Sequence, residues 1–150
     1  MTNKLFFSSI LFFFGCVVLN AQEVEIKEDK VLLDKKEILK YEKLSFDQHS
    51  FYSLDDNEIL MYKYNDNETR QYSDDDYIVL NFLTAKKKIE SKNTMNAIAG
   101  LGLNTKKNMQ KLIAWLLKEK VITAEGQLNT DKLDIFYEKY HENISERTIR

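Results

Sequence analysis

Residues 77–83 read Tyr77-Ile78-Val79-Leu80-Asn81-Phe82-Leu83 and form the most apolar strand candidate of the chain. Runs of this length that are rich in β-branched and aromatic residues are typical of buried strands, so we expect this one near the centre of a sheet. Shorter strand candidates precede it from residue 24 onward, with turn-forming residues between them. This succession predicts an antiparallel β meander over about residues 24–91.

The strand candidates before this stretch cover residues 24–27, 30–33, 38–41, 51–53 and 59–64. Turns are predicted at Glu28-Asp29, at Asp34-Lys35-Lys36 and at Asp55-Asp56-Asn57. Because the chain has no proline and only four glycines, we expect its turns to use Asn and Asp, which tolerate left-handed backbone. Residues 86–90 either pair with residues 77–83 or begin a connector to the next element.

The hydrophobic period changes in the last third of the chain. The apolar residues Met109, Leu112, Ile113, Leu116 and Leu117 follow helical spacing and predict an amphipathic helix over about residues 105–120. A second such stripe predicts a helix over about residues 130–144; it consists of Leu133, Phe136, Tyr137, Tyr140 and Ile144. Between them we expect extended backbone at residues 121–122 and a turn at residues 125–126. Strands followed by helices predict an α+β fold with two helices packed on the sheet.

The first 21 residues have the layout of a secretory signal peptide. Lys4 precedes an apolar run over residues 5–19, and Ala21-Gln22 offers a small residue before a polar stretch. The run is shorter than the roughly 20 residues that span a bilayer. We therefore expect cleavage between Ala21 and Gln22, a single α+β domain over residues 22–150, and a periplasmic or secreted location. An alternative is lipid attachment at Cys16, which would tether the chain to a membrane as a subunit of an envelope complex.

The composition narrows the classes of partner and site. The chain has 22 basic and 24 acidic side chains, and loss of residues 1–21 removes Lys4 and leaves a net charge of −3. Such a weak negative charge gives no electrostatic reason to expect nucleic acid as a partner. The only cysteine, Cys16, lies in the leader. The mature chain therefore has no disulfide and no thiolate metal site, and packing alone must hold it together.

No motif of the chain predicts a catalytic residue, a metal site or a cofactor. Gly100-Leu101-Gly102 lacks the third glycine of a dinucleotide-binding loop. The acidic residues of the 65–76 loop (Asp66, Glu68, Asp74, Asp75 and Asp76) lack the spacing and the glycine of a calcium-binding loop. His49 lies within Asp47-Gln48-His49-Ser50, but adjacent residues do not generally converge as a triad. A small hydrolase assembled from dispersed carboxylates and His49 stays open as an alternative function.

Four aromatic residues are the candidates for binding: Tyr62, Tyr64, Tyr77 and Trp115. Tyr62 and Tyr64 are two positions apart in a strand candidate and so share one sheet face, and Trp115 lies at the edge of its helix stripe. Exposed rings of this kind can anchor a protein or glycan partner in the cell envelope. The other interpretation is that these rings cover the core. The sequence leaves the oligomeric state and the covered face of the sheet open.

Two parts of the chain resemble small exported proteins of Gram-negative bacteria. One is the leader end, Leu19-Asn20-Ala21-Gln22. The other is the tail, in which helix 106–120 leads into Glu125-Gly126-Gln127-Leu128-Asn129 and then into residues 134–140 with Phe136 and Tyr140. The resemblance implies a location in the bacterial envelope and no particular activity. We therefore expect an exported, non-catalytic binding or accessory domain.

Overall fold

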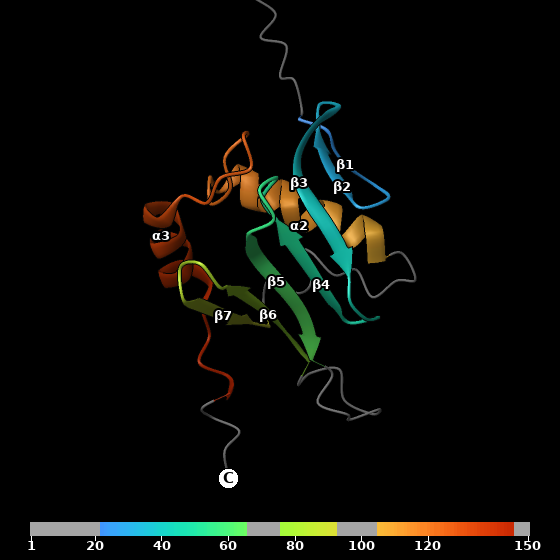
Figure 1. The fold of residues 1–150 in the computed structure, drawn as a ribbon. Helices are drawn as coiled ribbons and strands as arrows, with labels where there is room; N and C mark the ends of the chain where they lie inside the picture. The colour runs from blue at the N-terminus through green and yellow to red at the C-terminus, as the bar shows by residue number, and fades with distance from the viewer. Residues whose placement is uncertain (1–21, 66–75, 93–104, 146–150) are drawn as a thin grey trace, which may run out of the picture.

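Seven strands precede two helices along the chain, and the computed structural model describes residues 22–65, 76–92 and 105–145 (Figure 1). The strands are β1 (Val24–Lys27), β2 (Lys30–Leu33), β3 (Lys36–Lys43), β4 (Gln48–Tyr52), β5 (Glu58–Asn65), β6 (Tyr77–Phe82) and β7 (Lys87–Ser91). The helices are α2 (Thr105–Lys118) and α3 (Thr130–Tyr140). The predicted α+β fold with an antiparallel meander is confirmed.

The strands form one sheet in which the spatial order follows the order in sequence. The β2–β3 hairpin turns at Asp34 and Lys35, both with positive φ (49° and 69°), the backbone whose twist matches that of paired strands. Asp56 also has a positive φ of 64°, but so do Glu28 (54°) and Lys86 (52°). The turns are therefore not confined to Asn and Asp, because hairpin geometry sets φ and other side chains accept a cost of roughly 1–2 kcal/mol.

Strand β6 lies next to the edge strand β7 and not in the centre of the sheet, so the expected central position is wrong. In a meander the position of a strand follows its place in the chain and not its hydrophobicity. Residues 87–91 pair with β6, which decides between the two interpretations of that stretch. Strand β4 begins at Gln48, before the predicted run. Its polar residues are bonded within the sheet, as when Ser50 Oγ donates to Glu58 at 2.6 Å.

One face of the sheet carries the hydrophobic core. Two sets of neighbouring residues in register are buried there: Tyr41, Phe51 and Leu60 in one row, and Tyr62, Leu80 and Ile89 in the next. The buried helix residues, which are Met109, Leu112, Ile113, Leu116, Leu133 and Phe136, belong to the same hydrophobic cluster. Helix α2 contacts β1, and α3 contacts β7 at the other edge of the sheet.

The connector between the helices has the predicted turn, and of the predicted extended pair Ile122 forms a β-bridge while Val121 lies in a bend. Helix α2 ends at Lys118, two residues early, and Lys120 then adopts a left-handed φ of 61°. The N–H groups of Lys120 and Val121 bond back to the last turn of α2, which satisfies its free carbonyls. Ile122 and Leu128 form an isolated antiparallel bridge. Gly126 lies in the turn of this small hairpin with a φ of 77°.

Helix α3 ends at Tyr140, and the predicted extension to residue 144 is wrong. His141 has extended backbone, although its N–H still bonds to Tyr137 at 2.9 Å. The next N–H, that of Glu142, donates to the carbonyl of Glu90 in β7 at 2.7 Å. Ile144 is buried, at 6% exposure, but it belongs to an irregular segment and not to the helix. Hydrogen bonds to β7 therefore replace a further helical turn.

Candidate functional site

A pocket of about 330 Å³ lies where β7, α3 and residues 141–145 meet. We call these last residues the post-helix segment and the cavity the β7 pocket. Lys86, Lys87 and Lys88 line the pocket from the β6–β7 turn and from β7. The other lining residues are Glu90 of β7, Tyr137 of α3, and His141, Asn143 and Ser145 of the post-helix segment. Its volume falls at the lower end of the range found for small-molecule sites.

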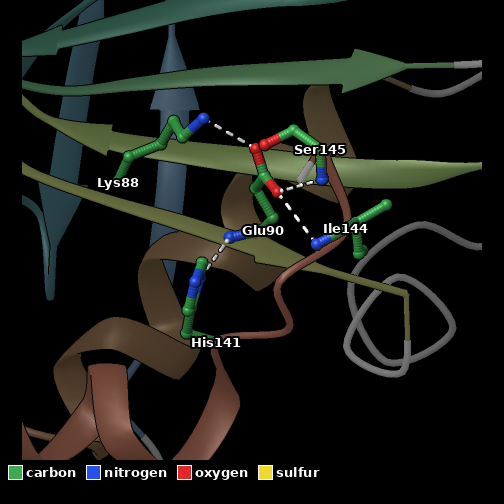
Figure 2. A network of polar contacts seen from close by, with 5 residues as sticks. All are labelled: Lys88, Glu90, His141, Ile144 and Ser145. Atoms are coloured by element: carbon green, nitrogen blue, oxygen red, sulfur yellow. Dashed lines mark hydrogen bonds and ion pairs between the residues drawn. The ribbon is translucent and has the colours of Figure 1, made fainter. Parts of the chain in front are cut away.

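Glu90 fixes the wall of this pocket. Its side chain is on strand β7 and is almost completely buried, with 2% of the residue exposed. One carboxylate oxygen accepts the backbone N–H groups of Ile144 at 3.2 Å and Ser145 at 2.8 Å. The other oxygen pairs with Lys88 Nζ at 2.7 Å (Figure 2). Burial alone would raise the pKa of Glu90, but the bonds from Lys88 and Ser145 outweigh it and hold that pKa below its ordinary value.

The backbone of β7 also bonds to the post-helix segment. The N–H of Glu90 donates to Nδ1 of His141 at 3.2 Å (Figure 2). Glu142 accepts from Ser91 Oγ at 3.0 Å and from the Lys92 N–H at 2.5 Å. The segment is therefore attached to Glu90 at both of its ends, His141 and Ser145, and through Glu142 between them to Ser91 and Lys92.

Two stacked rings form the α3 side of the pocket. The rings of Tyr137 and His141 are nearly parallel, with centroids 4.5 Å apart and planes inclined by 15°. Lys87 Nζ lies 4.9 Å from the centroid of the Tyr137 ring, a cation–π contact, and it also pairs with Asp134. The imidazole of His141 is thus held by the Tyr137 ring and by the Glu90 N–H. Such fixed polar groups orient a ligand better than mobile ones do.

The four predicted binding aromatics do not form an exposed patch. Tyr62 and Tyr64 do share a face, but Tyr62 is 4% exposed, and burial raises its pKa to about 12. Tyr77 is buried as well, and Tyr64 is half-buried and donates to Asp76. The expectation that these rings are exposed is therefore wrong for Tyr62 and Tyr77. Tyr62 is part of the hydrophobic core, whereas Tyr77 is buried outside that cluster, on the side of β6 opposite Ile78 and Leu80.

Trp115, the fourth of these aromatics, lies apart from the tyrosines of the sheet. Its ring is half-buried and packs against Phe136 and Tyr140 of α3, with centroids 4.6 and 4.8 Å away. This contact joins the two helices. The ring thus has a packing partner on a side of α2 that the helical stripe did not include.

His49 is completely buried, and its Nδ1 lies 2.9 Å from Tyr41 Oη. Burial lowers its pKa, and the Phe46 carbonyl offsets only part of that shift. Ser50, the next residue, bonds to Glu58 because neighbouring strand residues point to opposite faces. Asp47 instead accepts from Ser45 at 2.5 Å. The neighbours of His49 in sequence therefore do not converge on it as a catalytic set.

Several predicted features lie outside the described residues. These are Cys16, Ala21, the Gly100–Gly102 stretch, and all of the acidic loop except Asp76. Within residues 22–65, 76–92 and 105–145, no three His, Cys, Asp or Glu side chains are grouped so that they could hold a metal ion. In the same ranges, no helix has both the length and the apolar character needed to cross a bilayer.

Comparison with known proteins identifies no relative: the chain matches no protein-family model, no curated protein and no solved structure.

The residues of the β7 pocket are not among the predicted binding residues. The sequence shows Lys86-Lys87-Lys88 as an exposed basic run, and the predicted helix to residue 144 assigns His141 to a helix surface. One signal was present, because Glu90 follows the apolar Ile89 in a strand whose other outward-facing residue is a lysine. A lone acid between apolar and basic strand residues is a candidate for a buried, paired carboxylate.

Proposed function

We propose that this chain is an exported, non-catalytic binding domain and that the β7 pocket is its binding site. The observation that supports this most directly is a pocket with a fixed wall, since the Glu90 carboxylate accepts two N–H groups of the post-helix segment and also pairs with Lys88 of its own strand. The leader-like sequence of residues 4–22 and the resemblance to small envelope proteins support export. The natural partner under this proposal is a protein or glycan of the cell envelope.

We further infer that both helices pack over the sheet face that carries Tyr41, Phe51 and Leu60. The shared hydrophobic cluster and the contacts of α2 with β1 and of α3 with β7 support this arrangement. It would leave the β7 edge and the pocket beside it open to a ligand.

Binding is favoured over catalysis by the state of the polar groups in the pocket. A general base needs a lone pair within reach of a substrate proton. Glu90 already accepts from two backbone N–H groups and from Lys88, and Nδ1 of His141 already accepts from the Glu90 N–H. The acceptors of these two residues are thus used to hold the segment. The hydrolase alternative centred on His49 gains no support, because that ring is completely buried.

A fragment screen by NMR tests the proposed site. Isotope-labelled protein obtained by expression of the full chain would be titrated with a set of acidic, neutral and basic fragments. We expect the hits to shift the amide signals of Lys87, Tyr137, His141 and Ser145. The signals of Val31 and Leu39, in β2 and β3 near the opposite edge of the sheet, serve as the internal control and should not move. Hits that avoid the pocket, or no hits at all, would contradict the proposal.

Intact-mass analysis of the same protein, recovered from cells, tests export. We expect a chain that begins at Gln22. A diacylated Cys16 would instead show that the exported chain is tethered to a membrane and not free. A full-length chain confined to the cytoplasm would contradict export in either form.

A further inference from the structure

The charges that line the β7 pocket leave one positive charge without a counterion. Lys88 pairs with Glu90, and Lys87 pairs with Asp134. Lys86, at the left-handed position of the β6–β7 turn, has no carboxylate partner among the described residues, and its side chain is exposed. The lining therefore offers a single cation, next to two pairs that are already neutral.

In His141 and Glu90, the hydrogen-bond acceptors are occupied and one donor is left free. Nδ1 of His141 accepts the Glu90 N–H, so the proton of a neutral imidazole is on Nε2, which is then a donor. The Glu90 carboxylate, the only acidic group in the lining, is occupied by donors from Lys88, Ile144 and Ser145. Among the charged and imidazole groups of the lining, a cation and a fixed N–H donor remain for a ligand, beside the neutral side chains of Tyr137, Asn143 and Ser145.

We infer that the β7 pocket binds a carboxylate group of its ligand, with Lys86 supplying the charge and Nε2–H of His141 the oriented hydrogen bond. This inference rests on the proposed function and names the chemistry of its ligand. A carboxylate carries one negative charge and two acceptor oxygens, which matches one cation and one N–H donor. A phosphate carries nearly two charges at neutral pH and would leave one uncompensated here.

The geometry around His141 supplies the specificity. The Tyr137 ring stacks on one face of the imidazole, and the Glu90 N–H fixes its rotation. Lys86 by itself would attract any anion. The N–H donor, whose direction does not depend on the lysine, selects a group with an acceptor oxygen in the right place.

Titration with acetate tests the inference, and acetamide is its matched control because it has the same shape without the charge. We expect acetate to shift the signals of His141 and Lys87 in a saturable manner, with an affinity that falls as salt is added. Acetamide at the same concentrations should leave them unchanged. Lys86→Gln should weaken acetate binding about tenfold, the loss of one charge-assisted bond. Lys36→Gln, at an exposed lysine of β3 that lies four strands away from β7, should change the acetate affinity less than twofold.

A further variant tests the hydrogen bond of His141. His141→Phe keeps a flat ring for Tyr137 but removes Nε2–H, together with the Nδ1 that accepts the Glu90 N–H, and we expect about a tenfold loss of acetate affinity. Urea unfolding of each variant verifies that it is folded, and signals from the Trp115 region should stay in place.

The outcomes separate this inference from the proposed function. If neutral fragments bind in the pocket and acetate does not, the carboxylate inference fails and the binding site stands. If phosphate binds more tightly than acetate, the assignment of a single-charge ligand is overturned. If nothing shifts the pocket signals, both proposals fail. Equal binding of acetate to the Lys86→Gln and Lys36→Gln variants would also overturn the inference, since the free cation would then have no role.

Discussion

Replacement of Glu90 by Ala tests the link between β7 and the post-helix segment. The substitution leaves the N–H groups of Ile144 and Ser145 without their acceptor, and a buried donor without a partner costs about 1–3 kcal/mol. Detachment of the segment limits the total, because the N–H groups then bond to water. Detachment exposes Ile144, at about 1.5–3 kcal/mol, and the regained chain entropy offsets part of this cost. We expect a loss of about 2 kcal/mol.

Two measurements check this value. Urea denaturation gives the free energy of unfolding, and amide hydrogen exchange reports on the segment directly. A loss of about 2 kcal/mol corresponds to roughly thirtyfold faster exchange at Ile144 and Ser145. Glu90→Gln, which keeps one acceptor oxygen but no charge, should cost about half as much. Lys88→Met should cost less than about 1 kcal/mol, since Lys88 is half exposed. A Glu90→Ala variant within about 0.5 kcal/mol of wild type, with unchanged exchange, would refute the reasoning.

The Glu90 carboxylate should also make the stability of the folded protein depend on pH in the acidic range. The pKa of Glu90 is lower in the folded protein than its ordinary value of 4.5, so the unfolded chain binds its proton first as the pH falls. The stability that Glu90 contributes is therefore present above about pH 4.5 and is lost as the pH falls through the lower, folded pKa. Glu90→Gln should lack this part of the acid dependence. Identical pH profiles for the two proteins would contradict the assignment.

The remaining predictions concern three positions of the fold. Gly126→Ala should cost at least about 3 kcal/mol by urea denaturation, because its Cβ would lie 2.0 Å from the Ile38 carbonyl oxygen at a φ of 77°; Glu125→Ala, next to it and exposed, is the control. His49→Phe should flatten the stability profile between pH 7 and 5, because burial lowers the folded pKa of His49 and wild type loses stability as the pH falls below the ordinary value of 6.5. An unchanged slope would show that His49 is protonated without opening of the core. Asn129→Ala removes the cap that accepts the Lys132 N–H at 3.1 Å and should lower the unfolding free energy by about 1 kcal/mol; Asn129→Asp should retain most of it.

The meander could be predicted because its signals are local. Alternation of apolar and polar residues sets each strand, and four of the six connections between strands have two to four residues, as at Asp34 and Lys35. The start of β4 was missed for the opposite reason. Ser50 is a polar residue whose place in the sheet depends on a bond to Glu58, in the next strand. Propensity within a short window does not contain that information.

The end of α3 also depends on contacts that are distant in sequence. Ile144 fits the helical stripe and is indeed buried, so the pattern predicted its environment correctly and its conformation wrongly. What decides the conformation is competition between a further helical turn and hydrogen bonds to Glu90, more than fifty residues away in sequence. Tyr62 is the equivalent case in the sheet. Its face followed from the alternation, but whether that face is covered is a tertiary property.

Stability of the segment and binding in the pocket should be coupled, because His141 and Ser145 belong to both. If only the attached segment completes the pocket, the apparent dissociation constant for acetate is the intrinsic one divided by the attached fraction. Glu90→Ala should then weaken acetate binding by the factor by which it lowers the attached fraction, and acetate should in turn slow exchange at Ile144 in wild type. Asn129→Ala separates this effect from general destabilisation, since it weakens α3 at its far end and leaves the Glu90 bonds intact. If it lowers acetate affinity as much as Glu90→Ala does, the coupling belongs to the whole fold and not to the segment.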